Sequence, residues 1–404
     1  MVKHRVLLWL LLFLSLPFVA NAKTTVYLLT TYPSDREVYT VWGHTALLVT
    51  TDSTSVVYNY GVFEFSDDFI YKFVSGQTDY CLDTDSPQTV ANELVWKNSY
   101  AYLHELDLTV AEAERVHAAL LLNAKPENKV YRYKFFSDNC ATRPRELLER
   151  CIGEVKYMPI GNTESYRDKV HVLCASMPWL RVGIDLCLGS GADEVIPDSM
   201  VTFLPVELMK QVESATVSDS SGATRPLVKS KLEMWHPQPK KFVAGDFPVS
   251  PVKAGVLLLF LALLSFLFAW RNICVAYVRA FGAFLFFAFG LTGMLIFFLT
   301  FFSTHECTFP NFNLMWTNPL HLVVAGVLAV GARNRFAKAV LSVDLLLCVG
   351  YMLLIAMLPQ STCVEFTLCS LSLIISCLSY LVVYKKSFFA KFDKKTLQDK
   401  QRIK

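Results

Sequence analysis

Residues 254–270 read AGVLLLFLALLSFLFAW, and this stretch divides the chain into two parts of different character. It contains no charged side chain and approaches the roughly 20 apolar residues that a helix needs to cross a membrane. Residues 23–250 before it have the composition of a water-soluble domain, whereas Leu, Phe, Val and Ala dominate residues 251–385. The sequence therefore predicts one soluble domain followed by a membrane domain.

Four more apolar stretches follow the first one, at about 281–302, 320–332, 339–358 and 364–384. The third is short for a span, and we expect an irregular entry to it. Lys and Arg occur in two of the connections, as Arg271, Arg279, Arg333, Arg335 and Lys338, and in the tail 386–404. The connections at 303–321 and 358–366 contain neither. The five apolar stretches predict five spans. Because cytoplasmic loops are enriched in Lys and Arg, the alternation of charged and uncharged connections predicts an exported soluble domain and a cytoplasmic tail.

The first 22 residues, MVKHRVLLWLLLFLSLPFVANA, have the three parts of a signal peptide. A basic start precedes an apolar run, and Ala20-Asn21-Ala22 matches an A-x-A cleavage site. We expect cleavage after Ala22; an uncleaved anchor helix is the alternative. Either interpretation exports the soluble domain, in agreement with the charge pattern of the loops.

The soluble domain alternates strand and helix patterns, which indicates an α+β fold. Runs at 24–33, 44–51 and 55–65 are rich in β-branched and aromatic residues, and the last two are typical of a hairpin. Residues 131–136 alternate like a strand. Helices are predicted at 109–126, where Thr109 and Glu112 form a capping box, and at 138–152. Residues 93–108 read as a helix and then a strand, 165–175 and 205–214 as helices, and 214–221 as a Ser-rich loop.

Five of the 11 cysteines lie in the soluble domain: Cys81, Cys140, Cys151, Cys174 and Cys187. An exported domain can keep disulfides, and an odd number leaves one thiol over unless it pairs elsewhere. Cys307 and Cys363 both lie in predicted outer loops and are a possible pair.

Cys140 stands within FFSDNCATRPR, residues 135–145, between a predicted strand and a predicted helix. Free backbone N–H groups at a helix start favour a nearby negative charge, and only the thiolate form of cysteine is nucleophilic. We expect these N–H groups, together with Arg143 and Arg145, to lower the pKa of Cys140. Half of a disulfide and a buried packing residue are the alternatives.

His44, at the start of a predicted strand, is the candidate general base for Cys140. Asn59 or Tyr60, on the neighbouring strand of the hairpin, would orient its ring, with a purely structural role as the alternative. Backbone N–H groups at the helix start, with Asn139 or an arginine, would bind an oxyanion. His104 and His117 read as structural. No metal motif occurs in the soluble domain, and the net charge of +3 gives no reason to expect nucleic-acid binding.

Several segments of the chain resemble the Lnb N-terminal periplasmic domain family, first catalogued as a domain of unknown function in Bacteroidota. They are WGHTALLV (42–49), YNYGVFEF (58–65), YRYKFFSDNCATRPRELL (131–148), SYRDKVH (165–171), FLPVEL (203–208), NFNLMWTNPL (311–320) and the stretch containing Trp179, Gly183, Asp185, Gly189 and Asp193. The most specific feature of the resemblance is the segment DNCATR (138–143) together with the upstream dipeptide Gly43-His44. The resemblance covers nearly the whole chain after residue 22.

The resemblance implies a lipoprotein N-acyltransferase of the bacterial inner membrane with its catalytic domain in the periplasm. It also implies a permuted papain-like fold of the NlpC and lecithin:retinol acyltransferase type, in which His precedes Cys. On this basis His44 and Cys140 match the family's histidine and nucleophile, and Asn139, Arg143 and Arg145 match motif positions. The expected partners are a membrane phospholipid as acyl donor and a lipoprotein as acceptor, and no cofactor is expected.

Two further interpretations concern the membrane half. Aromatic residues in the loop Phe309–Trp316 are expected at the membrane interface. Asn318 and His321 are candidates for contact with a lipid head group, with capping of a short helix as the alternative. The rival functions are a cysteine peptidase or amidase acting on cell-wall peptides, and a non-catalytic membrane scaffold with Cys140 in a disulfide.

Overall fold

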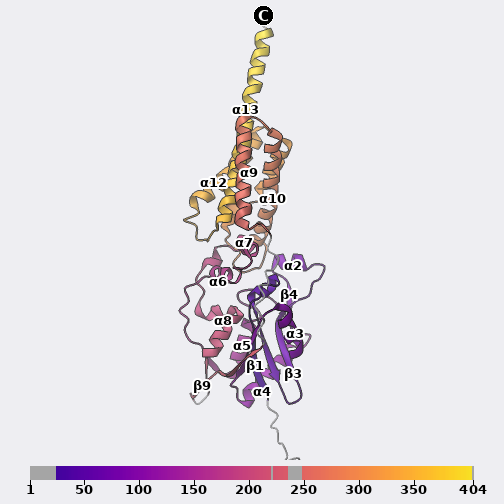
Figure 1. Cartoon of the computed structure of the whole chain (residues 1–404), viewed down its shortest axis with the longest axis vertical. Helices are drawn as coiled ribbons and strands as arrows, with labels where there is room; N and C mark the ends of the chain where they lie inside the picture. Colours follow the sequence, from indigo (N-terminus) through magenta and orange to yellow (C-terminus); the bar gives the residue numbers. More distant parts are fainter. Residues whose placement is uncertain (1–23, 220–221, 235–247, 403–404) are drawn as a thin grey trace, which may run out of the picture.

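An α+β domain and a bundle of long helices lie end to end along the long axis of the molecule (Figure 1). The computed structural model describes residues 24–219, 222–234 and 248–402, with side chains up to residue 385. The predicted signal peptide lies outside the described residues. The chain passes from one part to the other at Pro251, where the first apolar helix begins.

The α+β domain is built on a seven-stranded antiparallel sheet with the strand order β10-β5-β1-β2-β3-β4-β6. The strands are β1 (Thr25–Thr31), β2 (His44–Thr50), β3 (Ser55–Val62), β4 (Asp79–Asp85), β5 (Ala101–Leu106), β6 (Val130–Arg132) and β10 (Val228–Met234). The predicted hairpin is confirmed, with Ala46 opposite Asn59 and Thr50 opposite Ser55. β4 and the helix α2 (Phe69–Ser75) were not predicted.

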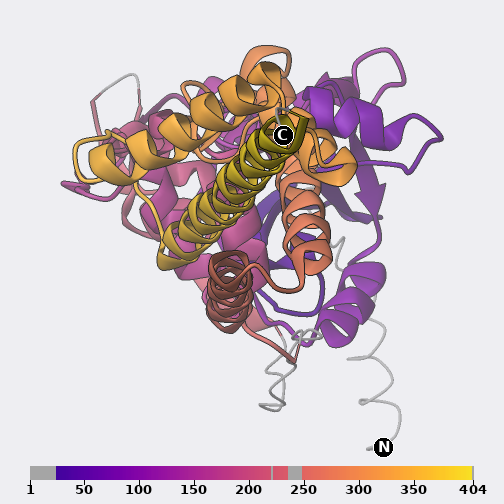
Figure 2. The ribbon, with the colours of Figure 1, turned by 90° about the horizontal axis from the view of Figure 1, so that it is seen from above.

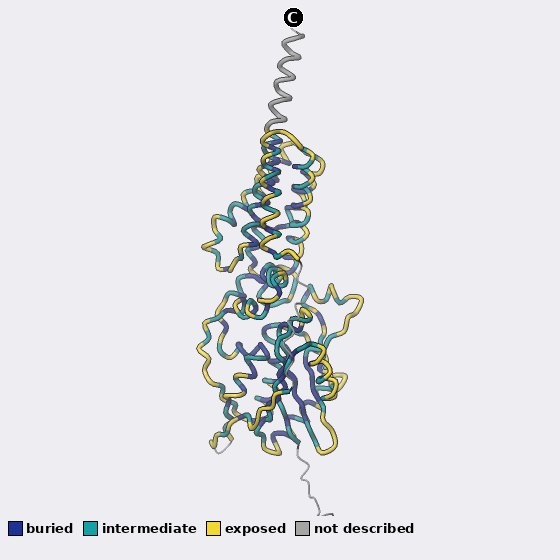
Figure 3. Tube along the Cα trace, in the orientation of Figure 1, coloured by how far each residue is buried: buried dark blue, intermediate teal, exposed yellow. Residues whose placement is uncertain are grey.

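Helices cover both faces of this sheet because successive residues of its strands place apolar side chains on opposite faces. One set, which includes Ala46, Leu48 and Val57, packs against α3 (Pro87–Lys97). The other set, which includes Leu47 and Tyr60, packs against α4 (Val110–Asn123), α5 (Thr142–Ile152) and α8 (Pro205–Ser214). α4 starts with the predicted capping box. In Figure 3 the buried backbone follows the middle of this layered domain.

The strand predicted at 131–136 is wrong beyond residue 132, because β6 pairs with β4 only up to Arg132 and the chain then turns. The Ser-rich loop predicted at 214–221 is also wrong in part. It contains β8 (Thr216–Ser218), which pairs with β7 (Glu154–Lys156) and β9 (Thr224–Pro226) in a small second sheet. Short polar strands of this kind carry too little periodicity to be predicted.

Two helices at the membrane side of the domain, α6 (Tyr166–Leu173) and α7 (Pro178–Cys187), are joined by buried charges. Arg167 donates to Asp185 at 2.9 Å and to Asp193 at 2.9 Å, and it is only 2% exposed. Asp185 and Asp193, two positions of the family resemblance, therefore hold this layer together.

Within the part of the chain that the structure describes, five helices are long and apolar enough to cross a membrane, in agreement with the prediction. They are α9 (Pro251–Arg271), α10 (Val275–Phe301), α11 (Leu320–Val330, preceded by the short helix Phe312–Met315), α12 (Arg335–Leu354) and α13 (Val364–Arg402). The irregular entry to the third span is confirmed. Figure 2 shows the bundle from above, over the α+β domain.

The connection between α10 and α11 is anchored in the α+β domain. Gly189 donates its N–H to the carbonyl of Cys307 at 2.7 Å, and Glu306 accepts from the N–H of Phe136 at 2.9 Å. A Cβ at Gly189 would lie 2.3 Å from the carbonyl oxygen of Pro310, so this position excludes every side chain. The two parts of the chain thus form a packed junction.

One expectation for this connection is wrong in part and another is wrong. Trp316 is 1% exposed and packs inside the bundle, so it does not lie at the membrane interface, whereas Phe309 is exposed. His321 is fully buried and bonds to Asp344, which excludes contact with a head group. Asn318 accepts from the N–H of Leu320 at 3.0 Å, as the capping alternative predicts.

Candidate active site

Cys140 lies in the loop that leads into α5, two residues before the helix begins at Thr142. The turn is held by Asn139, whose Oδ1 accepts from the N–H groups of Ala141 and Thr142 at 2.7 and 3.0 Å. The Asn139 amide also donates to the carbonyls of Phe135 and Phe203. Because every polar atom of this side chain is engaged, Asn139 shapes the loop and is not free to bind an oxyanion.

The thiol of Cys140 is almost completely buried, with 9% of the residue exposed. Burial raises its pKa above the usual value; hydrogen bonds from the backbone of Thr45, from its own N–H and from the Tyr133 hydroxyl lower it only in part. Since burial disfavours the charged form, the expected low pKa is wrong. The resting group is a thiol.

The two arginines that were expected to lower this pKa face other partners. Arg143 forms a double hydrogen bond to Asp138 at 2.5 and 2.9 Å and lies over the ring of Tyr131. Arg145 donates to the carbonyl of Ser199 and the hydroxyl of Thr202. Both fix the start of α5 to its surroundings, so the structure gives them a positioning role.

His44 is the first residue of β2, and a chain of hydrogen bonds orients its ring. Its Nε2 lies 3.2 Å from Oδ1 of Asn59, and Nδ2 of Asn59 donates to Oδ2 of Asp85 at 2.7 Å. A carboxylate only accepts, so the Asn59 amide must turn its NH₂ to Asp85 and its oxygen to the ring. Nε2 then carries the proton, and Nδ1, which has no hydrogen bond among the described residues, is the basic nitrogen.

Burial lowers the pKa of His44 to about 4. The charge of Lys97, on α3, lowers it further, and the hydrogen bond to Asn59 raises it in part. His44 is therefore neutral at pH 7, which is the state that a general base requires.

The end of β2 brings His44 and Cys140 together. β2 pairs with β1 from His44 onward, but with β3 only from Ala46 onward, so Thr45 has no β3 partner in the ladder. The thiol of Cys140 interacts with the backbone N–H of Thr45. It thus lies against the peptide group that joins His44 to Thr45.

The two side chains reach this place from opposite faces of the sheet. His44 leaves β2 on the side of α3, with Ala46, whereas Cys140 packs with Leu47 on the side of α5. Among the described residues no hydrogen bond joins the His44 ring to Sγ, a contact that often forms only when substrate binds. Gly61 borders the thiol-bearing residue, because a Cβ there would lie 3.5 Å from that of Cys140.

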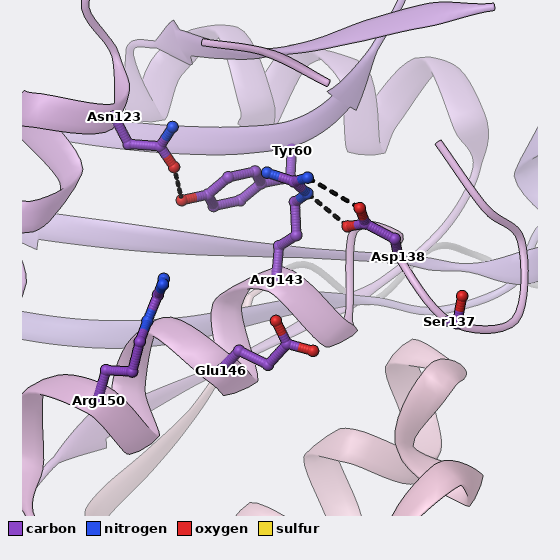
Figure 4. A pocket seen from close by; sticks show the side chains of 7 residues that line it. All are labelled: Tyr60, Asn123, Ser137, Asp138, Arg143, Glu146 and Arg150. Atoms are coloured by element: carbon purple, nitrogen blue, oxygen red, sulfur yellow. Dashed lines mark hydrogen bonds and ion pairs between the residues drawn. The ribbon is translucent and has the colours of Figure 1, made fainter. Parts of the chain in front are cut away.

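Of the two candidate partners of His44, the structure pairs Asn59 with it and turns Tyr60 away. The Tyr60 hydroxyl donates to Asn123 at 2.7 Å, on the α4 side of the sheet. It borders a polar pocket of about 310 Å³, lined by Tyr60, Asn123, Ser137, Asp138, Arg143, Glu146 and Arg150 (Figure 4). Arg150 forms no ion pair or hydrogen bond with any described residue, and the pocket suits a polar group.

Three residues of the site were missed in the sequence: Thr45, Asp85 and Tyr133. Asp85 ends an alternating run, CLDTD, just before the helix signal Ser86-Pro87, and this pattern was the available clue. Thr45 contributes only its backbone, and the contact of Tyr133 depends on a turn, so neither had a local signal. The eleven cysteines, Cys140, Cys307 and Cys363 included, are all free, so the disulfide alternatives are contradicted.

One group of metal-type ligands lies close together within the part of the chain that the structure describes, and it is in the bundle. The ligand atoms of His321, Asp344 and Cys348 are all within 4.8 Å of one another. Both ring nitrogens of His321 are already engaged, by Asp344 at 2.7 Å and by the carbonyl of Trp316 at 2.9 Å. This arrangement suits a buried His–Asp pair better than a metal site.

Comparison with known families divides the chain in the same way as its structure. Residues 18–169 match the family model of the Lnb N-terminal periplasmic domain, and residues 243–387 match that of the Lnb transmembrane domain. No curated protein and no solved structure matches the chain. The permuted papain-like architecture therefore stays a prediction.

Proposed function

Because the chain belongs to the Lnb family, whose domains indicate a multi-pass membrane protein with a periplasmic N-terminal domain, we propose that it is a lipoprotein N-acyltransferase of the bacterial inner membrane. Its acyl donor would be a membrane phospholipid, and its acceptor the α-amino group of a lipoprotein's N-terminal lipidated cysteine. The observation that carries this proposal is the free thiol of Cys140 against the peptide that joins His44 to Thr45.

In the first half of the reaction Cys140 takes the acyl group from the lipid. Sγ attacks the ester carbonyl while Nδ1 of His44 accepts the thiol proton. The tetrahedral intermediate collapses by breaking the bond between the acyl carbon and the ester oxygen. His44 then returns its proton to the leaving alkoxide, so a lysolipid alcohol departs and an acyl thioester remains on Cys140.

In the second half the lipoprotein amine attacks the thioester carbon. The carbon–sulfur bond breaks and an amide bond forms. His44 accepts a proton from the attacking amine and passes it to the departing thiolate, which restores the thiol. Atoms and charge balance over the two steps, and no cofactor is needed.

The thiolate would form only during attack, because both groups of the site are neutral at rest. Burial raises the pKa of Cys140 and lowers that of His44 to about 4, so both groups are neutral at rest. A thiol stored in this form is protected from oxidation and alkylation, which require the thiolate. In the proposed attack the ring and the thiol would meet around the end of β2, where Thr45 has no β3 partner.

The oxyanion of the intermediate would be held by backbone donors rather than by the side chain of Asn139. The backbone N–H groups of Cys140 and Thr45 both favour the charged form of this sulfur, because they lower its pKa. Two such donors in a dry site can stabilise the charge that develops on the carbonyl oxygen during attack on this sulfur. Because β2 and α5 hold these donors, their positions are set before substrate arrives.

The site also offers a separate place for the polar part of a substrate. The pocket beside Tyr60 is lined by polar and charged residues, so it fits a polar group and not an acyl chain. The membrane bundle keeps the domain next to its lipid substrates, a feature that a peptidase acting on cell-wall peptides does not require.

The decisive experiment uses bacteria that lack their own lipoprotein N-acylation step. The wild type and the variants Cys140→Ser and Cys151→Ser are expressed there, and the N-terminus of a lipoprotein is analysed by mass spectrometry. Cys151 is a matched control, since it is a free, half-buried cysteine at the other end of the same helix. We expect N-acylated product with the wild type and Cys151→Ser only. N-acylated product with Cys140→Ser would sink the thioester mechanism.

A further inference from the structure

The helix α2 exposes an unusual amount of apolar surface for a helix outside the membrane. Phe65, Ile70, Tyr71 and Phe73 are 82%, 78%, 67% and 49% exposed. With Phe63 and Phe69, whose rings contact that of Phe65 at 5.3 and 4.7 Å, they form what we call the α2 aromatic patch. Contiguous apolar surface of this kind marks a site of interaction with a partner or a membrane.

Hydrogen bonds place this patch at the level where the membrane ends. The span α10 ends at Phe301, and the residues just after it are bonded to α2. Thr304 donates its N–H to the carbonyl of Ser75 at 3.0 Å, and Nε2 of His305 donates to the carbonyl of Phe73 at 2.6 Å. In Figure 1 α2 lies beside the domain-facing end of α10.

Exposed rings of the bundle continue the patch on the membrane side. Phe301, Phe302 and Phe309 are 54%, 64% and 63% exposed, and the ring of Phe73 contacts His305 at 5.9 Å. Aromatic side chains favour the boundary between lipid and water. A lipid leaflet therefore fits this surface better than a soluble protein, because the neighbouring rings already belong to the end of a span.

A row of rings runs from the α2 aromatic patch to the thiol. Phe63 contacts Tyr80 at 5.2 Å, and Tyr80 stacks on Tyr133 at 4.3 Å. The side chain of Tyr133 interacts with the Cys140 thiol and lowers its pKa. The inner end of the row meets Cys140 at Gly61, since a Cβ there would lie in ordinary contact with both, 3.4 Å from the Tyr133 ring and 3.5 Å from Cys140 Cβ.

We propose that the α2 aromatic patch dips into the outer leaflet of the membrane and that the row Phe63–Tyr80–Tyr133 guides a lipid acyl chain from the leaflet to Cys140. The first half of this proposal stands on the position of α2 alone. The second half rests on the proposed acyl transfer. The ligand class is a long-chain acyl ester, which aromatic surface binds through its apolar area.

Photo-crosslinking tests the first half without any need for catalysis. The photoreactive amino acid p-benzoylphenylalanine is placed at Ile70 in the full chain, in vesicles of phosphatidylethanolamine and phosphatidylglycerol. Phe260, exposed on the span α9, is the positive control, and Leu121, exposed on α4, is the negative control. We expect lipid adducts at Ile70 and Phe260 and none at Leu121. Adducts of Ile70 with a second copy or with lipoprotein only, or none, would overturn the proposal.

The second half is tested with Ile70→Asp and the matched control Leu121→Asp. A charge on the patch should raise KM for vesicle lipid about tenfold or more, since burial of an isoleucine side chain contributes that much to binding. Acylation of Cys140 by the water-soluble ester p-nitrophenyl acetate should be unchanged, which separates lipid access from chemistry. Equal KM values for both variants would overturn the guiding role. If the wild type itself transferred no acyl group to the lipoprotein, the proposed function would be refuted. The crosslinking result would still test the contact between the α2 aromatic patch and lipid.

Discussion

Two histidines of this chain lie near a cysteine, and the structure treats them differently. In the periplasmic domain His44 has Nε2 bonded to Asn59 and Nδ1 without a partner among the described residues, at a half-buried strand end beside Cys140. In the bundle His321 is fully buried, with Nδ1 on Asp344 and Nε2 on a backbone carbonyl, near Cys348.

The difference shows that residue types alone do not make an active site. A general base needs one ring nitrogen free to take a proton and a path for substrate. His44 meets the first condition, because its Nδ1 has no hydrogen bond among the described residues. His321 meets neither, because its two nitrogens and its surface are occupied. We infer that the first histidine serves chemistry and the second serves the packing of the bundle.

The largest expected effect follows from removing the proposed base. His44→Ala should lower the rate of acyl transfer by about 10²–10⁴, the usual contribution of general acid–base catalysis. The rate is measured as N-acylated lipoprotein formed per folded molecule in vesicles, with near-ultraviolet circular dichroism as the check on folding. A variant that keeps half of the wild-type rate would break the comparison, since His44 would then be as structural as His321.

The next effect concerns the free energy of unfolding. His321→Leu leaves the Asp344 carboxyl without its partner inside the bundle, so it should destabilise the fold by about 3–5 kcal/mol. The double variant His321→Leu/Asp344→Leu should regain most of this loss, because two apolar side chains replace the pair. Thermal unfolding in detergent measures both. If the single variant were as stable as the wild type, the pair would have no structural role.

A smaller effect is expected for the residue that orients His44. Asn59→Ala removes one hydrogen bond to the ring, so acyl transfer should fall by up to about tenfold, the value of one such bond. Asp85→Asn should act in the same direction, since its new NH₂ can rotate the Asn59 amide and favour the other tautomer of His44. Steady-state rates of acyl transfer measure both effects. If Asn59→Ala lowered the rate as much as His44→Ala, an orienting role of Asn59 would be contradicted.

The smallest effect is a shift along the pH axis. With the pKa of His44 near 4, the base stays neutral down to that pH, and kcat/KM should fall only as pH drops through about 4. Since the hydrogen bond to Asn59 raises this pKa, the acid limb should move to still lower pH in Asn59→Ala. Rates between pH 3.5 and 8 test this, with circular dichroism to exclude unfolding. An acid limb near 6.5 would mean that burial does not control His44 during turnover.

Local patterns predicted a large part of the fold. The five apolar helices, the hairpin of β2 and β3 and the capping box of α4 follow from residues close together in the sequence. The predicted strand at 131–136 failed because the strand pairing ends at Arg132 and a turn follows at residues 135–137. A turn of this kind depends on contacts with residues far away in the sequence, and such contacts leave no hydrophobic periodicity in the local sequence.

The residues of the candidate site stay a prediction, whereas the expected electrostatics of Cys140 were wrong. Cys140, His44 and Asn59 could be singled out from their places on a loop and two strands. The expected low pKa of Cys140 was wrong because desolvation outweighs the helix start, and the arginines turn to Asp138, Ser199 and Thr202. Desolvation depends on all the elements that cover a group, so no local stretch determines it.

By itself the sequence determined the division into a soluble and a membrane part, the five spans and the order of histidine and cysteine, since composition and periodicity act over neighbouring residues. Only the tertiary structure decided that Thr45 meets the thiol, that Asp85 stands behind Asn59, and that α2 lies at the end of a span. These contacts join residues far apart in the chain. They form because both faces of the sheet and the helix bundle pack in the arrangement in which the polar groups buried between them find hydrogen-bond partners.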